Sequence, residues 1–173
     1  MEKSLKPSSG KFDTSNICVL GIGNPDCGDD AAGPAVIQAL KEMMSPKYQL
    51  QTQNGETSEL IETLGHFDAV IIIDAIAARS EAGRIHRFNA SKMELPAIWF
   101  SKYSTHSMGV HEAIEMARVL GDLPARTLVF GIEGTHFEPG EDMSPEVEDK
   151  ISELAYMVKR EIDYLISKPI NPG

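Results

Sequence analysis

Short runs of apolar and alternating residues recur along the chain and predict a series of β-strands. The clearest run is Val70–Ile73, a continuous β-branched segment that Asp74 closes, which is typical of a central strand in a parallel sheet. We expect the Asp74 carboxylate to point out of the sheet at the carboxyl end of this strand. Five runs are predicted to form strands: Ile17–Gly21, Tyr48–Gln53, Val70–Ile73, Gly83–Asn89 (an edge strand) and Thr127–Ile132.

Helical spacing of apolar residues separates these runs. Pro34 lies in the first turn of one predicted helix, where proline is tolerated. Ser144 is placed like an N-cap residue, with Pro145 at the first helical position. Residues 90–106 show little periodicity and are predicted to form a loop. The predicted helices are Ala31–Met44, Thr57–Leu64, Ser107–Leu120 and one that runs from Pro145 to Leu165.

Strands that alternate with helices indicate an α/β fold. We expect a three-layer α/β/α arrangement around a twisted, mostly parallel sheet of about five strands. The sequence shows no internal repeat and no linker. We therefore predict one domain at residues 16–168, between a flexible arm at residues 1–15 and a tail at residues 169–173.

Charge and composition exclude several classes of function. The chain has 16 Lys and Arg against 26 Asp and Glu, a net charge of −10, which disfavours nucleic-acid binding. No signal peptide and no run of about 20 apolar residues are evident, so we predict no membrane insertion. The two cysteines, Cys18 and Cys27, are expected to remain unpaired, which suits the cytoplasm.

The candidate functional residues lie where the predicted strands end. In an open α/β sheet, sites form outside the carboxyl ends of the strands. Three loops would lie together on the side of the sheet where the strands end: Gly21–Asp30, Asp74–Ser80 and Gly131–Met143. The segment that bears His106 could approach the same edge.

Three residues at this edge form the candidate site. Singly, Asp30 could cap a helix, Asp74 could cap a turn, and His106 could be an ordinary loop histidine. Together they are two carboxylates and one imidazole, which could hold a divalent metal with open positions or divide acid and base roles. Asp30, Asp74 and His106 are therefore the candidates for a metal site, and Asp30 and Asp74 the candidates for catalysis; the residues alone leave both interpretations open.

Three competing sites are weaker. A dinucleotide fingerprint would need glycine where Asp26 stands. Cys27 is a possible nucleophile, but the acidic residues around it oppose thiolate formation. His111 and Glu115 lie one helical turn apart without the H-E-x-x-H pattern of a metal site.

Four segments, in this order, resemble the hydrogenase maturation endopeptidases of nickel–iron hydrogenases. They are G-I-G-N-P-D-C-G-D-D-A-A-G-P, I-I-I-D-A-I, S-T-H-S-M-G-V-H-E-A-I and F-G-I-E…F-E-P-G-E-D-M-S-P-E-V. The resemblance covers residues 17–165 and implies a phosphorylase/hydrolase-like fold. It also implies removal of a C-terminal extension from the precursor of the hydrogenase large subunit after nickel insertion.

The resemblance assigns roles to particular residues. It places metal contacts at Asp30, Asp74 and His106, toward nickel that the substrate carries, with no tightly bound cofactor of the protease itself. Some family members have Glu at the position of Asp30, so the neighbouring Asp29 could compete. The segment at Gly55 and Glu56 departs from an Asp-Gly-Gly-Thr pattern that some members have, and we predict substrate contact there.

Two alternative functions remain open at this point. Peptidyl-tRNA hydrolases begin a similar fold with a G-x-G-N-P turn, but their motif continues to a catalytic histidine, and this chain has none before His66. A chaperone that inspects nickel without cutting would use the same three ligands.

Overall fold

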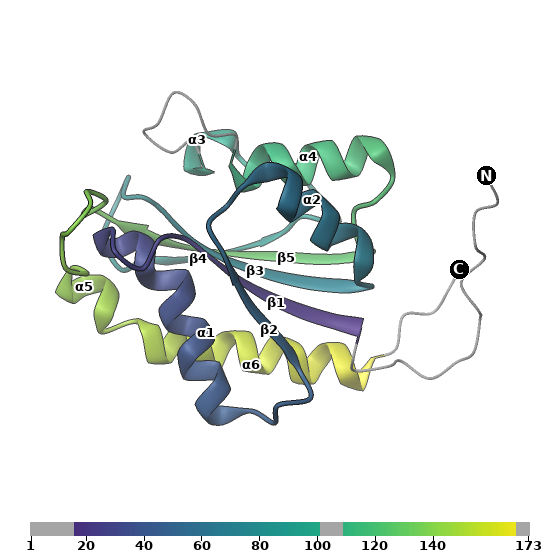
Figure 1. Cartoon of the computed structure of the whole chain (residues 1–173), viewed down its shortest axis with the longest axis horizontal. Helices are drawn as coiled ribbons and strands as arrows, with labels where there is room; N and C mark the ends of the chain where they lie inside the picture. The colour runs from purple at the N-terminus through teal and green to yellow at the C-terminus, as the bar shows by residue number, and fades with distance from the viewer. Residues whose placement is uncertain (1–15, 101–108, 169–173) are drawn as a thin grey trace.

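The computed structural model describes residues 16–100 and 109–168, which form a sheet between two layers of helices (Figure 1). The sheet has five strands in the order β2-β1-β3-β5-β4. Four strands run parallel, and β4 pairs antiparallel with β5. The strand β4 lies at one edge of the sheet, as the alternation at Gly83–Asn89 predicts. The strands are β1 (Ile17–Ile22), β2 (Gln49–Gln53), β3 (Ala69–Ala77), β4 (Ile85–Asn89) and β5 (Arg126–Gly134).

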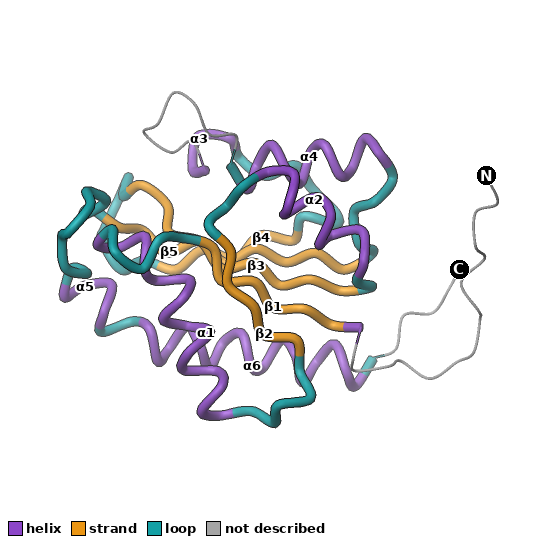
Figure 2. The backbone as a smooth tube through the Cα atoms, viewed as in Figure 1, coloured by secondary structure: helices purple, strands orange, loops and turns teal. Residues whose placement is uncertain are grey.

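Helices cover both faces of this sheet (Figure 2). One face packs against α1 and α6, which also contact each other, and the other against α2, α3 and α4. A short 3-10 helix, η2, precedes α1 directly. The helices are η2 (Gly28–Ala31), α1 (Ala32–Met43), α2 (Thr57–His66), α3 (Ala97–Phe100), α4 (Val110–Leu120), α5 (Pro145–Glu148) and α6 (Ile151–Ser167).

The central strand shows why the sequence has a continuous apolar run. Ile71 and Ile73 of β3 pack toward α1 and α6, whereas Val70 and Ile72 pack toward the opposite helices. All four side chains are fully buried. A strand that is covered on both faces needs apolar residues at every position rather than at alternate ones. The three-layer α/β/α prediction is confirmed.

The structure corrects three details. Residues 97–100, predicted as loop, form α3, because Phe100 is buried in the core on that side of the sheet. The single helix that is predicted from Pro145 to Leu165 is in fact two helices, α5 and α6. The Lys150 N–H bonds the carbonyl of Val147, three residues back, and this tighter turn separates the two helices. Ser144 precedes α5, but its side chain makes no capping bond to that helix.

Both Cys18 and Cys27 are free thiols, as predicted, and burial raises the pKa of Cys18 to about 12. Within residues 16–100 and 109–168, no helix has both the length and the apolar character needed to cross a membrane.

Candidate active site

The glycine-rich turn after β1 positions Asp30. The backbone of Gly23 has φ +141°, and a β-carbon there would lie 1.8 Å from the backbone oxygen of Asp30. Only glycine permits this approach, because any side chain would collide with the backbone of η2. The Asn24 N–H then donates to the Asp30 Oδ2 at 2.7 Å. Asp30 is only partly buried, so its carboxylate stays within reach of a substrate.

The adjacent Asp29 has a different role. It is fully buried. Its Oδ2 accepts hydrogen bonds from the Thr135 and His136 N–H groups at 2.7 and 3.0 Å, and its Oδ1 accepts from the Ser144 N–H at 2.7 Å. The Ser144 hydroxyl donates to Asp29 as well, which explains why it does not cap α5.

These bonds also control the ionisation of Asp29. Burial raises the pKa of its carboxyl, but the N–H groups of His136, Ser144 and Thr135 together outweigh that effect and lower the pKa below its ordinary value. Asp29 therefore ties η2 to the segment that follows β5. Of the two adjacent acids, Asp30 is the one that is partly exposed.

Asp74 does not end its strand, contrary to the sequence-based prediction. The strand β3 continues to Ala77 because it stays paired with β5 as far as Gly134. Asp74 lies opposite Gly131 and has no exposed surface. Because side chains alternate along a strand, it shares a face with Ile72 and Ile76, under the α2, α3 and α4 layer. The expectation that its carboxylate points out beyond the strand is wrong.

The packing of α1 brings the segments of Asp30 and Asp74 together. A β-carbon on Gly33 would lie 2.3 Å from the Ile22 carbonyl oxygen and 2.9 Å from that of Ile73. The first turn of α1 therefore rests on the end of β1 and on β3 at Ile73, the residue before Asp74. The side chain of Asp74 itself faces the opposite helix layer. The 3-10 helix η2 contacts β3 as well.

The third predicted ligand, His106, lies outside the described residues. Within the part of the chain that the structure describes, no three His, Cys, Asp or Glu side chains are grouped to hold a metal ion. Glu115 pairs with Arg118 at 2.9 Å. The three-residue metal site remains a prediction.

A buried carboxylate that the sequence analysis missed lies at the end of β5. Glu133 has no exposed surface. Its Oε2 accepts from the N–H groups of Arg79 and Ser80 at 2.7 and 2.8 Å, and its Oε1 is 2.7 Å from the His86 Nε2. Burial raises its pKa, but the hydrogen bonds from Ser80, His86 and Arg79 prevail and lower it to about 2.

Glu133 thus anchors the loop that leaves β3. A signal for it was present in the sequence, since a charged residue ends the otherwise apolar run from Leu128 to Ile132. A buried acid at such a position requires several donors.

The loop after β2 lies beside the glycine-rich turn. The Gly23 N–H donates to the Gln53 carbonyl at 3.0 Å, and Gly55 has φ +87°, a conformation that favours glycine. The Glu56 carboxylate caps α2 by accepting from the Ser58 and Glu59 N–H groups. Substrate contact by Gly55 and Glu56 remains a prediction, and Glu56 already has this capping role.

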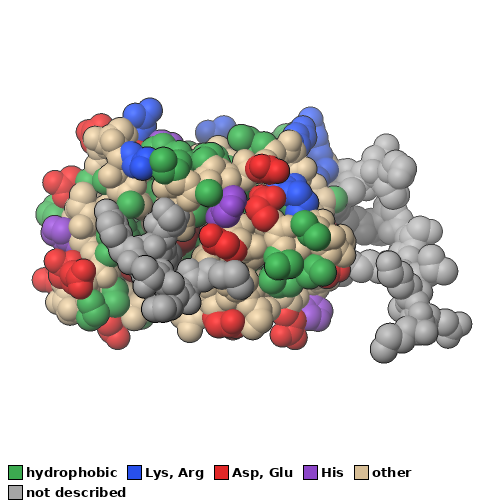
Figure 3. Space-filling model, turned by 90° about the horizontal axis from the view of Figure 1, so that it is seen from above, with side chains coloured by type: hydrophobic (Ala, Val, Ile, Leu, Met, Phe, Trp, Pro, Cys, Tyr) green, Lys and Arg blue, Asp and Glu red, His purple; other side chains and the backbone are tan. Residues whose placement is uncertain are grey.

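Acidic side chains gather at the end of the molecule that carries this edge (Figure 3, left). The segment between β5 and α5 contributes the exposed residues Glu138, Glu141 and Asp142. Their combined charge produces a negative potential that favours a positively charged group at this edge.

The fold, its polar edge and a family comparison together define the class of protein. Residues 34–161 match the model of the hydrogenase maturation protease family, and the chain belongs to that family. It is a hydrogenase maturation endopeptidase, an enzyme that processes the carboxyl terminus of a hydrogenase large subunit.

Individual relatives support this assignment. The chain is 28% identical over 137 residues to the hydrogenase 2 maturation protease of Escherichia coli, across 78% of this chain and 83% of that protein. It is 27% identical to the hydrogenase expression/formation protein HupD of Thiocapsa roseopersicina, across 86% and 67% of the two chains. The solved structure of the hydrogenase-maturating endopeptidase HybD from E. coli superposes with a TM-score of 0.71 at 26% identity, across 86% and 93%.

Proposed function

We propose that this endopeptidase removes the C-terminal extension of a nickel–iron hydrogenase large-subunit precursor only after nickel has been inserted, and that it recognises the nickel held by its substrate. The observation that carries the proposal is the packing of Asp30 and Asp74 on contacting elements at one edge of the sheet. Carboxylate and imidazole donors suit a divalent transition metal, so His106 is proposed as the third contact.

Selectivity for the loaded precursor would follow from differential binding. A protease whose ligands engage only a nickel-bearing substrate binds the unloaded form more weakly, so cleavage reports on metal insertion. The protease itself then needs no tightly bound cofactor. Gly55 and Glu56, beside the same turn, are proposed to contact the extended substrate.

The two carboxylates are proposed to divide the proton transfers. One, as a carboxylate, takes a proton from the water that attacks the scissile carbonyl, and the other, as a carboxylic acid, gives a proton to the leaving amine as the peptide bond breaks. Asp30 is the better placed to meet water, because it is partly exposed, whereas Asp74 is fully buried. Nickel on the substrate would supply additional polarisation of the water.

The partner and compartment follow from the same proposal. The partner is the hydrogenase large-subunit precursor, and the reaction takes place in the cytoplasm, where an unfinished precursor would be assembled. A net charge of −10 argues against nucleic acid as a partner.

Cleavage of matched precursors tests the proposal. Wild-type protein should shorten nickel-loaded precursor and leave nickel-free precursor intact, as resolved by mass spectrometry. Asp30→Asn should abolish cleavage, whereas Asp26→Asn, which changes an exposed acid of the same turn, should retain it. Equal cleavage of loaded and unloaded precursor would refute nickel recognition, and full activity of Asp30→Asn would remove Asp30 from the site.

A further inference from the structure

The outer edge of β4 presents free backbone groups. Among the described residues, β4 pairs only with β5 and so forms one border of the sheet. Gly83 N–H bonds the Glu133 carbonyl, and Glu133 N–H bonds the Arg84 carbonyl, which is a β-bulge that sets the register. Inward and outward backbone groups alternate from there, so those of Ile85 and Arg87 point to the outer side. The carbonyl of Asn89, at the end of β4, already accepts from the Lys92 and Met93 N–H groups.

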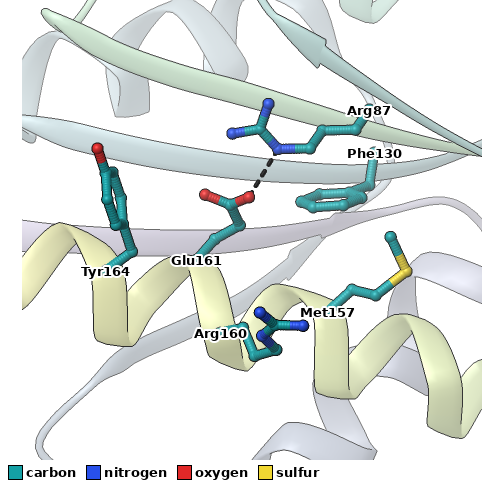
Figure 4. Close-up of a pocket in the computed structure, with 6 residues that line it drawn as sticks. All are labelled: Arg87, Phe130, Met157, Arg160, Glu161 and Tyr164. Carbon is teal, nitrogen blue, oxygen red and sulfur yellow. Dashed lines mark hydrogen bonds and ion pairs between the residues drawn. The ribbon is translucent and has the colours of Figure 1, made fainter.

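A shallow hollow lies beside this edge, between β4 and α6 (Figure 4). It has a volume of about 430 Å³. The lining combines apolar and charged side chains: Arg87, Phe130, Met157, Arg160, Glu161 and Tyr164. Side chains of a strand added to β4 would alternate, and every second one would face this hollow.

The charge of the hollow is opposite to that of the whole molecule. Arg87 bonds Glu161 at 2.7 Å through its Nε alone, as the dashed line in Figure 4 shows. Arg160 is exposed and forms no ion pair with any residue in the described ranges. Two guanidinium groups against one carboxylate give the hollow a net positive charge in a protein of net charge −10.

We propose that the outer edge of β4 and this hollow bind an extended segment of the precursor that carries an acidic side chain two positions away from an apolar one. The segment adds a strand to the sheet through the backbone groups of β4. Its acidic side chain meets Arg87 and Arg160, and its apolar side chain packs on Phe130 and Met157. The identity of the partner rests on the proposed function, whereas its chemistry comes from the hollow.

A second copy of this chain fits the edge less well. Arg87 is the central residue of the five-residue strand β4. Symmetric antiparallel pairing of two copies about this residue would place the two Arg87 side chains directly opposite each other, and like charges at that position are destabilising. A peptide with a carboxylate at that position gains an ion pair instead.

Charge-reversal variants test the ionic contact. Arg160→Glu should raise the KM for the nickel-loaded precursor about fivefold, with kcat unchanged, since it removes binding without touching the reacting groups. The dissociation constant should rise by the same factor. Lys41→Glu makes the same charge change at an exposed position of α1 and should alter both constants less than about twofold. Equal effects of the two variants would overturn the proposal.

A matched pair at Arg87 tests the added strand. Arg87→Gln removes the charge and keeps the backbone N–H. Arg87→Pro removes the charge and also the outward backbone N–H, and an edge strand tolerates a proline at such a position. The proline variant should bind the precursor about tenfold more weakly than the glutamine variant, and equal affinity would overturn strand addition. If the proline variant does not fold, the effect of Arg160→Glu on precursor binding decides whether the precursor uses this surface.

The binding assay also separates the two proposals. Wild-type protein that binds the precursor but cleaves it regardless of nickel would refute the proposed function, and the affinities of the variants would still decide whether the β4 edge is used. Wild-type protein that does not bind the precursor at all would overturn the β4-edge proposal itself.

Discussion

Replacing Glu133 with Gln should destabilise the protein by about 3 kcal/mol at neutral pH. The carboxylate is fully buried, and its pKa falls from its ordinary value of 4.5 to about 2. That difference of about 2.5, at 1.36 kcal/mol for each pKa unit, means that folding favours the ionised form by about 3 kcal/mol. The neutral amide has no second acceptor oxygen to replace Oε1 or Oε2, so most of this stabilisation should be lost.

The effect has a defined dependence on pH. Because the pKa is lowered in the folded state, the stabilisation is fully present above about pH 4.5 and is lost as the pH falls toward 2. At pH 3 about 2 kcal/mol of it should already be lost. The difference in unfolding free energy between wild type and Glu133→Gln should therefore shrink from about 3 kcal/mol at pH 7 to about 1 kcal/mol at pH 3.

Urea unfolding at the two pH values measures this difference. The single tryptophan, Trp99, reports on the region, since its ring lies 4.5 Å from that of His86, which bonds Glu133. The control Glu42→Gln removes an exposed acid and should cost less than about 0.5 kcal/mol at either pH. A difference between wild type and Glu133→Gln that is equal at both pH values would refute the role given to the charge.

Three further predictions concern the active-site edge. Asp29→Ala should cost about 2–4 kcal/mol in urea unfolding, because it removes the acceptor of three N–H groups, of which that of Ser144 is buried; an unchanged midpoint would contradict this. Asp74→Asn should abolish precursor cleavage while the protein still folds, because the amide keeps the volume of this fully buried side chain; normal cleavage would exclude Asp74 from the reaction. Gly23→Ala should impair both folding and cleavage, whereas Gly140→Ala, where φ is +82° and no atom lies within 4 Å of the new carbon, should cost only about 1 kcal/mol; similar losses in both variants would refute the steric argument.

The sequence by itself determined the layers, the strands and one edge of the sheet. The run from Val70 to Ile73 identified a strand that is buried on both faces, because only apolar residues can occupy such positions at every step. The alternation of apolar and polar residues in β4 indicated an edge strand, because a strand at the border of a sheet does not need an apolar residue at every position. The glycines before Asp30 indicated a tight turn, which the backbone of Gly23 confirms.

The tertiary structure alone decided how the acidic residues differ. The sequence does not distinguish Asp29 from Asp30. The groups that donate hydrogen bonds to the buried Asp29 belong to residues more than 100 positions away: Thr135, His136 and Ser144. The same holds for Glu133, whose donors come from the loop after β3. Strand ends are set by pairing with a neighbour, so the extension of β3 beyond Asp74 depended on β5. Local pattern determines which residues are buried together, whereas the environment of a charge depends on segments that only folding brings into contact.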